Sequence, residues 1–431
     1  MPKENCPTII IHRGTHQIGG CVTEIRSKSG TRIAIDIGEN LPSLEKEKQK
    51  QLKIPGLTKY TRNNKQEKKF DAVFVTHYHG DHVGLYNSVV KDIPIYAGEH
   101  TKNIYKMLQE RILPGKVRRR EISQREANQR LKRINDFNIY SEDKPVRKGD
   151  IKITPIKSDH SAFDAHMLLI ECDGKKILHT GDFRLHGIMG SELFKKLEKN
   201  VTKIDYLICE GTTLSRGDSK DNLKIQSEDD IGKEAKKIFK ENKYNFVYCS
   251  STNIDRIAEI YEAANSNHRL FVCDEYQKLV LEYINFVAEK ENLSNIYKFG
   301  KNKVKTYGNN LTQIMDKNGF VMIVRANKLF KKIMNNWKTD STFIYSTWDG
   351  YLLEEYYELY KNIQDFVPKD SKLIYLHTSG HADRESIKKV INILKPETII
   401  PIHGETPEMF EKIGLKNCKI VILHDEEEYY I

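Results

Sequence analysis

Apolar and polar positions alternate along the chain in two ways, and each predicts a different kind of sheet. Residues 8–38 place short apolar runs between glycine-bearing turns, which predicts strands of an antiparallel sheet. Strand and helix patterns then alternate up to about residue 209. From 211 to about 370 isolated apolar runs alternate with longer helical periods, as in Phe246–Cys249 followed by a helix from Asn253. This second pattern is typical of a parallel sheet with covering helices. The charged stretch 42–69 predicts a long loop.

A dense group of metal-binding side chains follows one apolar run. Residues 70–75 predict a buried strand, and four side chains with ligand atoms come directly after it: His77, His79, Asp81 and His82. Residues two apart in an extended chain point the same way, so His77 and His79 can hold one ion. A turn at Gly80 would bring Asp81 and His82 round to the same pocket, which suits a second ion. The sequence therefore predicts a metal site here.

Several later apolar runs also end in ionisable side chains. Residues 151–156 precede His160, and residues 175–180 precede Asp182. Glu210 ends another apolar run, while His381 and His403 follow two more near the end of the chain.

In this order the motifs resemble the metallo-β-lactamase superfamily, whose signature HxHxDH matches His77 to His82. The resemblance implies that His77, His79 and His160 hold one metal ion, that Asp81, His82 and His403 hold the other, and that Asp182 bridges them. It implies a four-layer αββα sandwich of class α/β with an inserted α/β domain. We expect the sandwich to span 1–210 and 372–431 and the insert to span 211–371.

Glu210, His381 and His403 resemble motifs A, B and C of the β-CASP group, and the chain as a whole is most similar to ribonuclease J. The resemblance implies two-metal hydrolysis of RNA that leaves a 5′-phosphate. Asp81 would orient the attacking water, His381 would protonate the leaving oxygen, and Glu210 would orient His381. DNA nucleases of the group commonly have valine at motif C, so His403 favours RNA. The imidazole-rich shell favours two Zn²⁺ ions, with Mn²⁺ as the alternative.

Hydroxyl and amide side chains between a predicted strand and helix form a candidate phosphate site. Free backbone N–H groups at a helix start can hold a phosphate, and similar turns face RNA in β-CASP ribonucleases. The alternative is ordinary N-capping by Ser251 or Thr252. His377 and Ser379 correspond to residues that hold a terminal 5′-phosphate in ribonuclease J-like exonucleases, although His377 could instead fix a metal ligand. The candidate phosphate-binding residues are Ser250, Ser251, Thr252, Asn253, His377 and Ser379.

Composition agrees with a nucleic-acid partner. The chain has 431 residues and a net charge of +10, which favours polyanions. A basic run extends from Lys116 to Arg133. A solvated face is the default interpretation of this run, and an RNA-guiding patch is the alternative. Seven scattered cysteines without CxxC spacing predict reduced thiols in the cytoplasm. We expect single-stranded RNA as partner and no membrane span. Oligomeric state is open, with a homodimer as one option.

Three other functions stay open on the sequence alone. A DNA nuclease of the same fold would use the same ligands. A hydrolase of small esters, thioesters or lactams would share HxHxDH, His160 and Asp182, but would leave Glu210, His381 and His403 without a role. A non-catalytic RNA-binding subunit of the β-CASP type would be expected to have lost some of these side chains.

Overall fold

The computed structural model describes residues 6–42, 51–59, 69–201, 203–215, 227–300, 303–337, 340–369, 371–415 and 418–431. Most of the predicted charged loop at 42–69 lies outside these residues. The chain forms two compact units. The first unit comprises Met1–Leu185, Met189–Asp221 and Gly380–Ile431, and the second comprises His186–Ile188 and Asn222–Ser379. The finer domain boundaries expected from the sequence stay a prediction.

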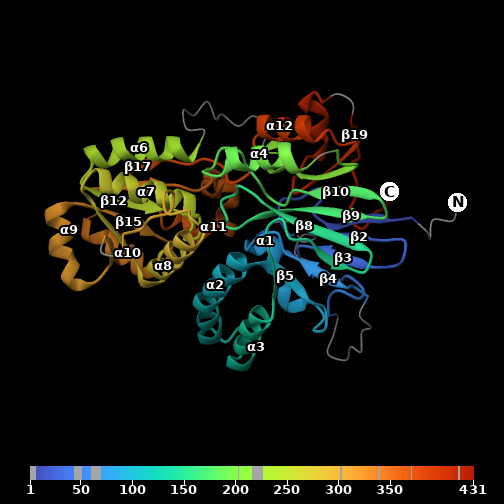
Figure 1. The fold of residues 1–431 in the computed structure, drawn as a ribbon. Helices are drawn as coiled ribbons and strands as arrows, with labels where there is room; N and C mark the ends of the chain where they lie inside the picture. Colours follow the sequence, from blue (N-terminus) through green and yellow to red (C-terminus); the bar gives the residue numbers. More distant parts are fainter. Residues whose placement is uncertain are drawn as a thin grey trace. The chain divides into compact units, whose positions relative to one another are not determined.

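Two seven-stranded sheets form the centre of the first unit (Figure 1). The first sheet has the order β20-β1-β2-β3-β4-β5-β6, with β20 (Glu428–Tyr430), β1 (Thr8–Arg13), β2 (Val22–Arg26), β3 (Arg32–Ile35), β4 (Ala72–Phe74), β5 (Ile95–Gly98) and β6 (Asn138–Tyr140). As the alternating pattern predicts, β1, β2 and β3 are antiparallel. The second sheet has the order β19-β18-β11-β10-β9-β8-β7, with β19 (Lys419–Ile420), β18 (Thr398–Ile402), β11 (Tyr206–Glu210), β10 (Lys175–His179), β9 (His166–Cys172), β8 (Ile151–Lys157) and β7 (Val146–Lys148).

The two sheets pack face to face over an aliphatic core. Ile9, Ile25 and Ile35 of the first sheet and Ile170 and Ile208 of the second are all fully buried in one cluster. Such inward-facing alternation is what packs two sheets together. The helices of this unit are α1 (Gly80–Val83), α2 (Glu99–Arg118), α3 (Gln124–Asn135), α4 (Gly190–Asn200), α5 (Thr212–Ser215) and α12 (Arg384–Leu394), with 3-10 turns η3 (Tyr86–Ser88) and η8 (Pro407–Ile413).

Helices cover the outer faces of the two sheets. Leu193 and Leu197 of α4 pack with Ile387 and Leu394 of α12 in a second buried cluster on the outer face of the second sheet. Helix α2 contacts β5 of the first sheet, and α3 packs against α2. Figure 1 shows α4 and α12 on one side of the sheets and α2 and α3 on the other. The unit is therefore the expected four-layer αββα sandwich.

The second unit is built on one six-stranded sheet in which every pairing is parallel, as predicted. Its order is β14 (Val304–Thr306), β13 (Leu270–Cys273), β15 (Phe320–Val324), β12 (Tyr244–Tyr248), β16 (Ser341–Tyr345) and β17 (Lys372–Tyr375). The helices are α6 (Glu228–Glu241), α7 (Ile254–Ser266), α8 (Glu275–Lys290), α9 (Thr312–Asn318), α10 (Lys328–Met334) and α11 (Tyr357–Gln364), with 3-10 turns η4 (Asn309–Leu311), η5 (Asn335–Trp337), η6 (Asp349–Leu352) and η7 (Glu354–Tyr356). This is the inserted α/β domain.

The insertion point lies between two neighbouring strands of the sandwich. Strands β11 and β18 pair in parallel, with Glu210 opposite Ile402, although the whole second unit separates them in sequence. Strand β10 pairs in parallel with β11 on the other side. The carboxyl ends of β10, β11 and β18 therefore meet at one edge of the second sheet. Among the described residues, no helix has the length and apolarity needed to cross a bilayer.

Candidate metal centre

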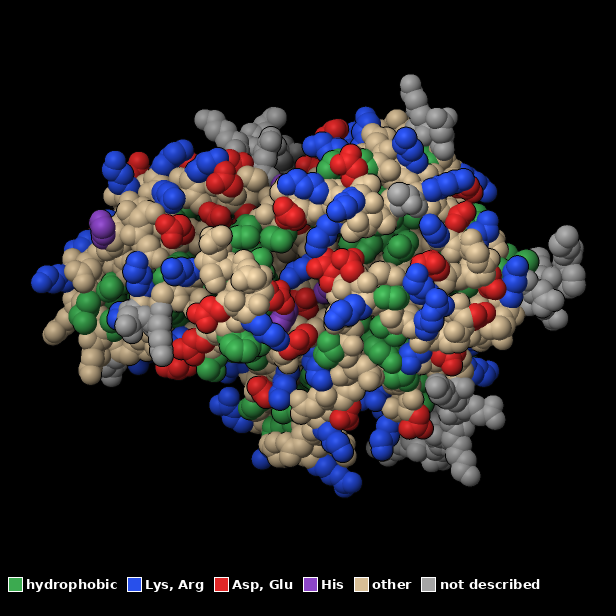
Figure 2. Space-filling view, in the orientation of Figure 1, with side chains coloured by type: hydrophobic (Ala, Val, Ile, Leu, Met, Phe, Trp, Pro, Cys, Tyr) green, Lys and Arg blue, Asp and Glu red, His purple; other side chains and the backbone are tan. Residues whose placement is uncertain are grey.

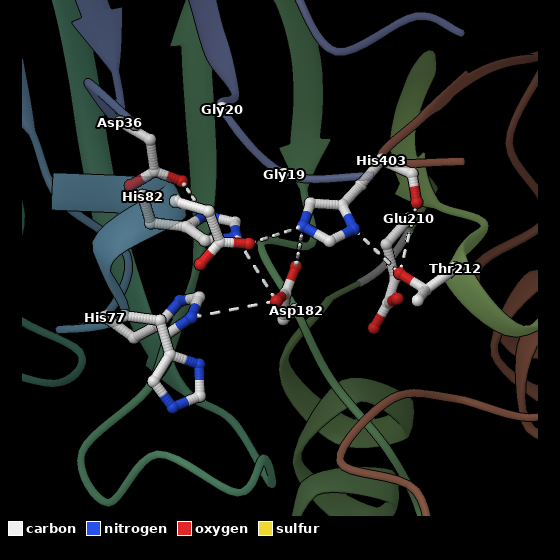
Figure 3. A network of polar contacts seen from close by, with 12 residues as sticks. Gly19, Gly20, Asp36, His77, His82, Asp182, Glu210, Thr212 and His403 are labelled. Carbon is white, nitrogen blue, oxygen red and sulfur yellow. Dashed lines mark hydrogen bonds and ion pairs between the residues drawn. The ribbon is translucent and has the colours of Figure 1, made fainter. Parts of the chain in front are cut away.

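Strand ends bring the predicted ligands of the first unit together. Asp182 comes shortly after β10, Glu210 is the last residue of β11, and His403 directly follows β18. The first sheet contributes the loop and the short helix α1 after β4, with His77, His79, Asp81 and His82. The close-up in Figure 3 shows Asp182 in the centre, with His77, His82 and His403 around it.

The described side chains form overlapping groups whose ligand atoms lie within 4.8 Å of one another. One group is His77, His79, His160 and Asp182, and another is Asp81, His82 and His403. Asp182 lies between them: Oδ2 is 3.2 Å from Nε2 of His82 and 3.7 Å from Nε2 of His77, while Oδ1 is 3.7 Å from Nε2 of His403. All seven predicted ligands thus meet in one place.

Buried atoms without hydrogen bonds show that this place fits a cation. Nε2 of His77, Nε2 of His82 and both carboxylate oxygens of Asp182 are buried and make no hydrogen bond of acceptable geometry among the described residues. A buried polar atom left unpaired is costly, and most such atoms in native proteins have a partner. Nε2 of His160 also lies only 3.2 Å from Nδ1 of His79. Ring nitrogens and carboxylate oxygens gathered in this way are a donor set for a divalent metal ion.

Neighbouring groups fix the imidazole rings so that lone pairs face the centre. Nδ1 of His82 lies 2.8 Å from Oδ2 of Asp36, and Nδ1 of His403 lies 2.7 Å from Oγ1 of Thr212. Nδ1 of His160 is 2.5 Å from the carbonyl oxygen of Gly380, to which it can only donate. In each ring a proton on Nδ1 leaves Nε2 free as a ligand, the usual arrangement around protein-bound zinc.

Asp36 and Thr212 are supporting residues that the sequence does not reveal. Asp36 follows β3 with φ of 60°, and its carboxylate also accepts hydrogen bonds from the backbone N–H and the hydroxyl of Thr76. Lone residues after a strand have no spacing signature. An acidic residue ending an apolar run, as in residues 33–36, was the one available signal.

Burial and the neighbouring charges set the protonation of the site. Burial lowers the pKa of His79 to about 4, and burial together with the adjacent imidazoles lowers the pKa values of His77 and His160 well below normal. These rings are neutral at pH 7, as metal ligands must be. Burial alone would lower the pKa of His82, but Asp182, Asp36 and Asp81 outweigh it and raise that pKa well above normal. The three carboxylates thus favour the positively charged form of His82.

His381 and Glu210 lie at the edge of the same cluster. The side chain of His381 is 19% exposed, and its Nδ1 lies 2.9 Å from Oε2 of fully buried Glu210. The other oxygen of Glu210 accepts a hydrogen bond from the backbone N–H of Phe183. Nδ1 of His381 is also 3.6 Å from Oδ2 of Asp182, and Asp182, Glu210, His381 and His403 form a third group of ligand atoms. Distances alone are therefore compatible with His381 as a proton donor or as a ligand.

A glycine turn packs directly against Asp81. Gly19 has φ of +75°, and a Cβ there would lie 2.8 Å from Oδ2 of Asp81. Figure 3 shows Gly19 and Gly20 above the cluster. The backbone N–H of Cys21 donates to the carbonyl of Asp81 at 3.2 Å. The absence of a side chain at Gly19 is thus what leaves room for this carboxylate.

The six candidate phosphate-binding residues all belong to the second unit. Residues 250–253 form the turn between β12 and α7, as predicted. The N-cap of α7 is Asn253, whose side chain accepts from the backbone N–H of Arg256. N-capping by Ser251 or Thr252, the alternative considered from the sequence, is therefore wrong, because the N-cap lies one residue after Thr252 and two after Ser251. Ser251 and Thr252 are nevertheless largely buried.

His377 and Ser379 follow β17, close to a buried arginine. Nη1 of Arg256 lies 3.5 Å from Nδ1 of His377, and Nη2 donates to the carbonyl of Thr378 at 3.0 Å. His186 Nε2 lies 2.9 Å from the carbonyl oxygen of Ser379. The segment that carries both predicted residues is thus held through its backbone.

Comparisons with known proteins agree with this geometry. A family model described as "Metallo-beta-lactamase superfamily" matches residues 42–226. A second, described as "Zn-dependent metallo-hydrolase RNA specificity domain", matches residues 367–411. Together these segments contain every predicted metal ligand. A solved protein of unknown function from Enterococcus faecalis is similar in fold, with a TM-score of 0.74 and 21% identity, over 99% of this chain and 100% of that one.

Several curated relatives are ribonucleases. Ribonuclease J of Mycoplasma genitalium is 26% identical over 84% of this chain and 65% of its own length. Ribonuclease J of Mycoplasma pneumoniae is 26% identical over 78% and 58%, and ribonuclease J 2 of Staphylococcus saprophyticus is 24% identical over 84% and 63%. The chain thus spans about three-fifths of the length of these relatives. Its cluster of histidines and aspartates is a divalent-metal site, and the chain is similar to the metallo-β-lactamase superfamily and, within it, to the ribonuclease J-like proteins of the β-CASP group.

Proposed function

We propose that this protein is a two-metal ribonuclease that hydrolyses phosphodiester bonds in single-stranded RNA and leaves a 5′-phosphate. The observation that supports it most is the place of Asp182, whose carboxylate lies within 4 Å of imidazoles from both proposed ligand sets: His77 and His160 in one, His82 and His403 in the other. A shared carboxylate between two ligand sets is typical of two-metal phosphodiesterases. The names of the curated relatives and the RNA specificity model support RNA as the substrate.

In this proposal His77, His79, His160 and Asp182 hold one ion, and Asp81, His82, Asp182 and His403 hold the other. Zn²⁺ suits the imidazole-rich shell, with Mn²⁺ as the alternative. Bound ions would supply Lewis-acid polarisation of the scissile phosphate and of the attacking water. The side chain of Asp81 is 15% exposed, whereas that of His403 is 1% exposed. Asp81 can therefore also accept a hydrogen bond from that water and orient it.

His381 is the proposed general acid. Its Nδ1 faces Glu210, so the carboxylate orients the ring. Nε2 then remains to donate a proton to the departing 3′-oxygen. The turn 250–253 together with His377 and Ser379 is the proposed contact to RNA phosphates, with donors from hydroxyl, imidazole and backbone N–H groups.

Cleavage of end-labelled RNA by the purified, zinc-loaded protein tests the proposal. We expect 5′-phosphate products from single-stranded RNA, loss of activity with a chelator, and recovery when Zn²⁺ or Mn²⁺ is restored. Nitrocefin and a thioester serve as comparison substrates for a small-molecule hydrolase, and single-stranded DNA serves for a DNA nuclease. Turnover of one of these comparison substrates, without any cleavage of RNA, would overturn the proposal. Comparing 5′-monophosphate with 5′-triphosphate RNA would then distinguish exonuclease from endonuclease action.

A further inference from the structure

The positive charge of this protein is concentrated in one helical hairpin of the first unit. Helices α2 and α3 with their connecting loop, Glu99–Asn135, contain eleven Lys and Arg residues and four Glu, a net charge of +7. The whole chain has a net charge of +10. Fewer than a tenth of the residues thus carry most of the charge excess that favours a polyanionic partner.

Some of these cations stabilise the hairpin itself. Arg133 donates to the backbone carbonyls of Lys91 and Ile93, and Lys102 donates to those of Asn135 and Phe137. These contacts tie the base of the hairpin to the rest of the unit. Three further cations are paired with glutamates: Lys106 with Glu110, Arg119 with Glu121 and Arg130 with Glu126.

Four cations at the tip make none of these contacts. Lys116, Arg118, Arg120 and Arg125 make no ion pair with any described residue, and the three arginines are exposed. Arg125 lies in the first turn of α3, where the helix dipole disfavours a cation. The dipole of α2 favours Lys116 and Arg118, which lie in its last turn, but it does not explain Arg120 or Arg125, and ion pairing explains none of the four. Like charges gathered on one surface create a field that attracts polyanions.

The base of the hairpin is joined to the loop that carries a predicted metal ligand. Helix α2 begins after β5, and the backbone N–H groups of His100 and Thr101 donate to Oδ2 of Asp164 at 3.0 and 2.8 Å. Asp164 lies four residues after His160. The neighbouring Phe163 donates its backbone N–H to the hydroxyl of Tyr78, which stands between His77 and His79. The base of the hairpin is thus bonded to the loop that follows His160, and that loop is bonded to the segment that carries His77 and His79.

The tip lies well away from the metal centre. Helix α2 has 20 residues, which at about 1.5 Å per residue extend roughly 30 Å. Figure 1 shows α2, which follows β5, side by side with α3, and Figure 2 shows Lys and Arg side chains around this part of the surface. With stacked bases about 3.4 Å apart, roughly nine nucleotides cover that length.

We propose that the tip of the α2–α3 hairpin, formed by Lys116, Arg118, Arg120 and Arg125, binds the phosphates of RNA several nucleotides away from the bond at the metal centre. This inference rests on the proposed ribonuclease function and adds to it a preference for long substrates. Contacts to phosphates are independent of sequence, so the tip selects for length and not for base identity.

Changing all four residues to glutamine tests this surface. The matched control changes Lys195, Lys199, Lys389 and Lys412 to glutamine, which are four exposed lysines in the α4, α12 and η8 region of the same unit. Both variants lose the same net charge. Binding is measured by fluorescence anisotropy across a salt series, with His381→Ala added to every protein so that the RNA stays intact. The probes are unstructured RNAs of about 30 and about four nucleotides, longer and shorter than the span to the tip.

We expect the tip variant to bind the long RNA about tenfold more weakly at low salt, with unchanged affinity for the short RNA. The slope of log K against log salt should fall by up to about 3, since each contact to a single strand contributes about 0.7. The control variant should behave like the unchanged protein. Equal losses in both four-site variants, or an equal loss with the short RNA, would overturn the inference.

The two proposals can fail separately. If the unchanged protein binds long RNA through the tip but cleaves no RNA, the proposed activity is wrong and the binding surface stands. If it cleaves RNA and the tip variant cleaves long and short RNA at unchanged rates and affinities, the surface is wrong and the activity stands. Thermal unfolding of each variant checks that the hairpin has kept its fold.

Discussion

Single side chains around Asp182 divide into those that can hold a cation and those that can move a proton. His82 is buried, and its two ring nitrogens face Asp36 and Asp182. His381 is partly exposed, and its Nδ1 faces Glu210. The first arrangement turns Nε2 of His82 toward Asp182 at the centre, whereas in the second the carboxylate of Glu210 orients the ring of His381 through Nδ1.

His381→Ala should therefore keep both metal ions and RNA affinity while losing about 10²–10⁴ in cleavage rate. His82→Ala and Asp182→Ala should lose metal and activity together. Metal content by mass spectrometry and single-turnover cleavage measure these effects. An RNA with a 3′-sulfur leaving group needs no proton from the enzyme. This substrate should restore much of the cleavage rate of the His381→Ala variant and none of the rate lost in the His82→Ala and Asp182→Ala variants. Loss of a metal ion from His381→Ala would instead assign it to the coordination shell.

Asp36 offers a test of the contacts behind the ligands. Asp36→Asn keeps the shape and tolerates the positive φ, but it removes the negative charge that holds the proton on Nδ1 of His82. We expect metal affinity to fall by about 10- to 100-fold. Competition with a chromogenic chelator measures it. Asp71→Asn, whose carboxylate accepts from the backbone N–H of Arg32, is the control and should leave metal affinity unchanged.

The sequence revealed the candidate ligands better than the residues that orient them. His77, His79, Asp81 and His82 are recognisable because local spacing alone brings them together. Asp182 and His403 became recognisable only through their order after that motif. Hydrogen bonds from distant parts of the sequence orient the rings of His82, His403 and His160, and the partners are Asp36, Thr212 and the carbonyl of Gly380. Many kinds of hydrogen-bonding group could do this, so no sequence pattern predicts these partners.

Among the elements, patterning predicted strand type but not strand order. The antiparallel start of the chain and the parallel sheet of the second unit follow from apolar periods and turn residues. The pairing of β1 with β20 and of β11 with β18 depends on contacts between segments far apart, which periodicity does not encode. The basic run between Lys116 and Arg133 was visible in the sequence, but its separation into paired and unpaired cations required the structure.

Buried Arg256 links several elements of the second unit. It donates to both oxygens of Glu228 in α6, to the carbonyl and hydroxyl of Ser346 after β16, and to the carbonyl of Thr378 after β17. Arg256→Met should cost about 3–5 kcal/mol, because it leaves Glu228 buried without its countercharge. Urea unfolding measures this loss.

Removing both charges at that site serves as the control. Arg256→Met combined with Glu228→Leu should recover part of the stability, since no unpaired charge remains. Recovery should be incomplete because the carbonyls of Ser346 and Thr378 still lose a donor. A double variant no more stable than Arg256→Met would contradict this account.

At the scale of the whole molecule, buried histidines make the metal-free protein sensitive to acid. Burial lowers the pKa of His79 and of His179 to about 4, and lowers the pKa values of His77, His160 and His166. In the unfolded chain such histidines titrate near 6.5. Between about pH 6.5 and 4 the unfolded state therefore binds protons that the folded state does not.

The free energy of unfolding of the chelator-treated protein should fall as pH decreases through this window, by up to about 1.4 kcal/mol per pH unit for each such histidine. His82 and His403, whose pKa values are raised, add no slope here because they are protonated in both states. Urea unfolding at a series of pH values measures the effect. His179→Gln, which removes a buried histidine that is not a proposed ligand, should reduce the slope. A flat profile from pH 6.5 to 4 would refute the assignment.

The separation of the ligands along the chain has a consequence for protein synthesis. His403 lies 322 residues after Asp81, with which it shares the centre. A ribosome that has not yet translated the codon for His403 therefore carries a chain with an incomplete centre, whatever the nascent segments have already folded into. Under the proposed ribonuclease function this order delays activity until the codon for His403 has been translated, so a nascent chain that lacks His403 would not cleave the message that encodes it.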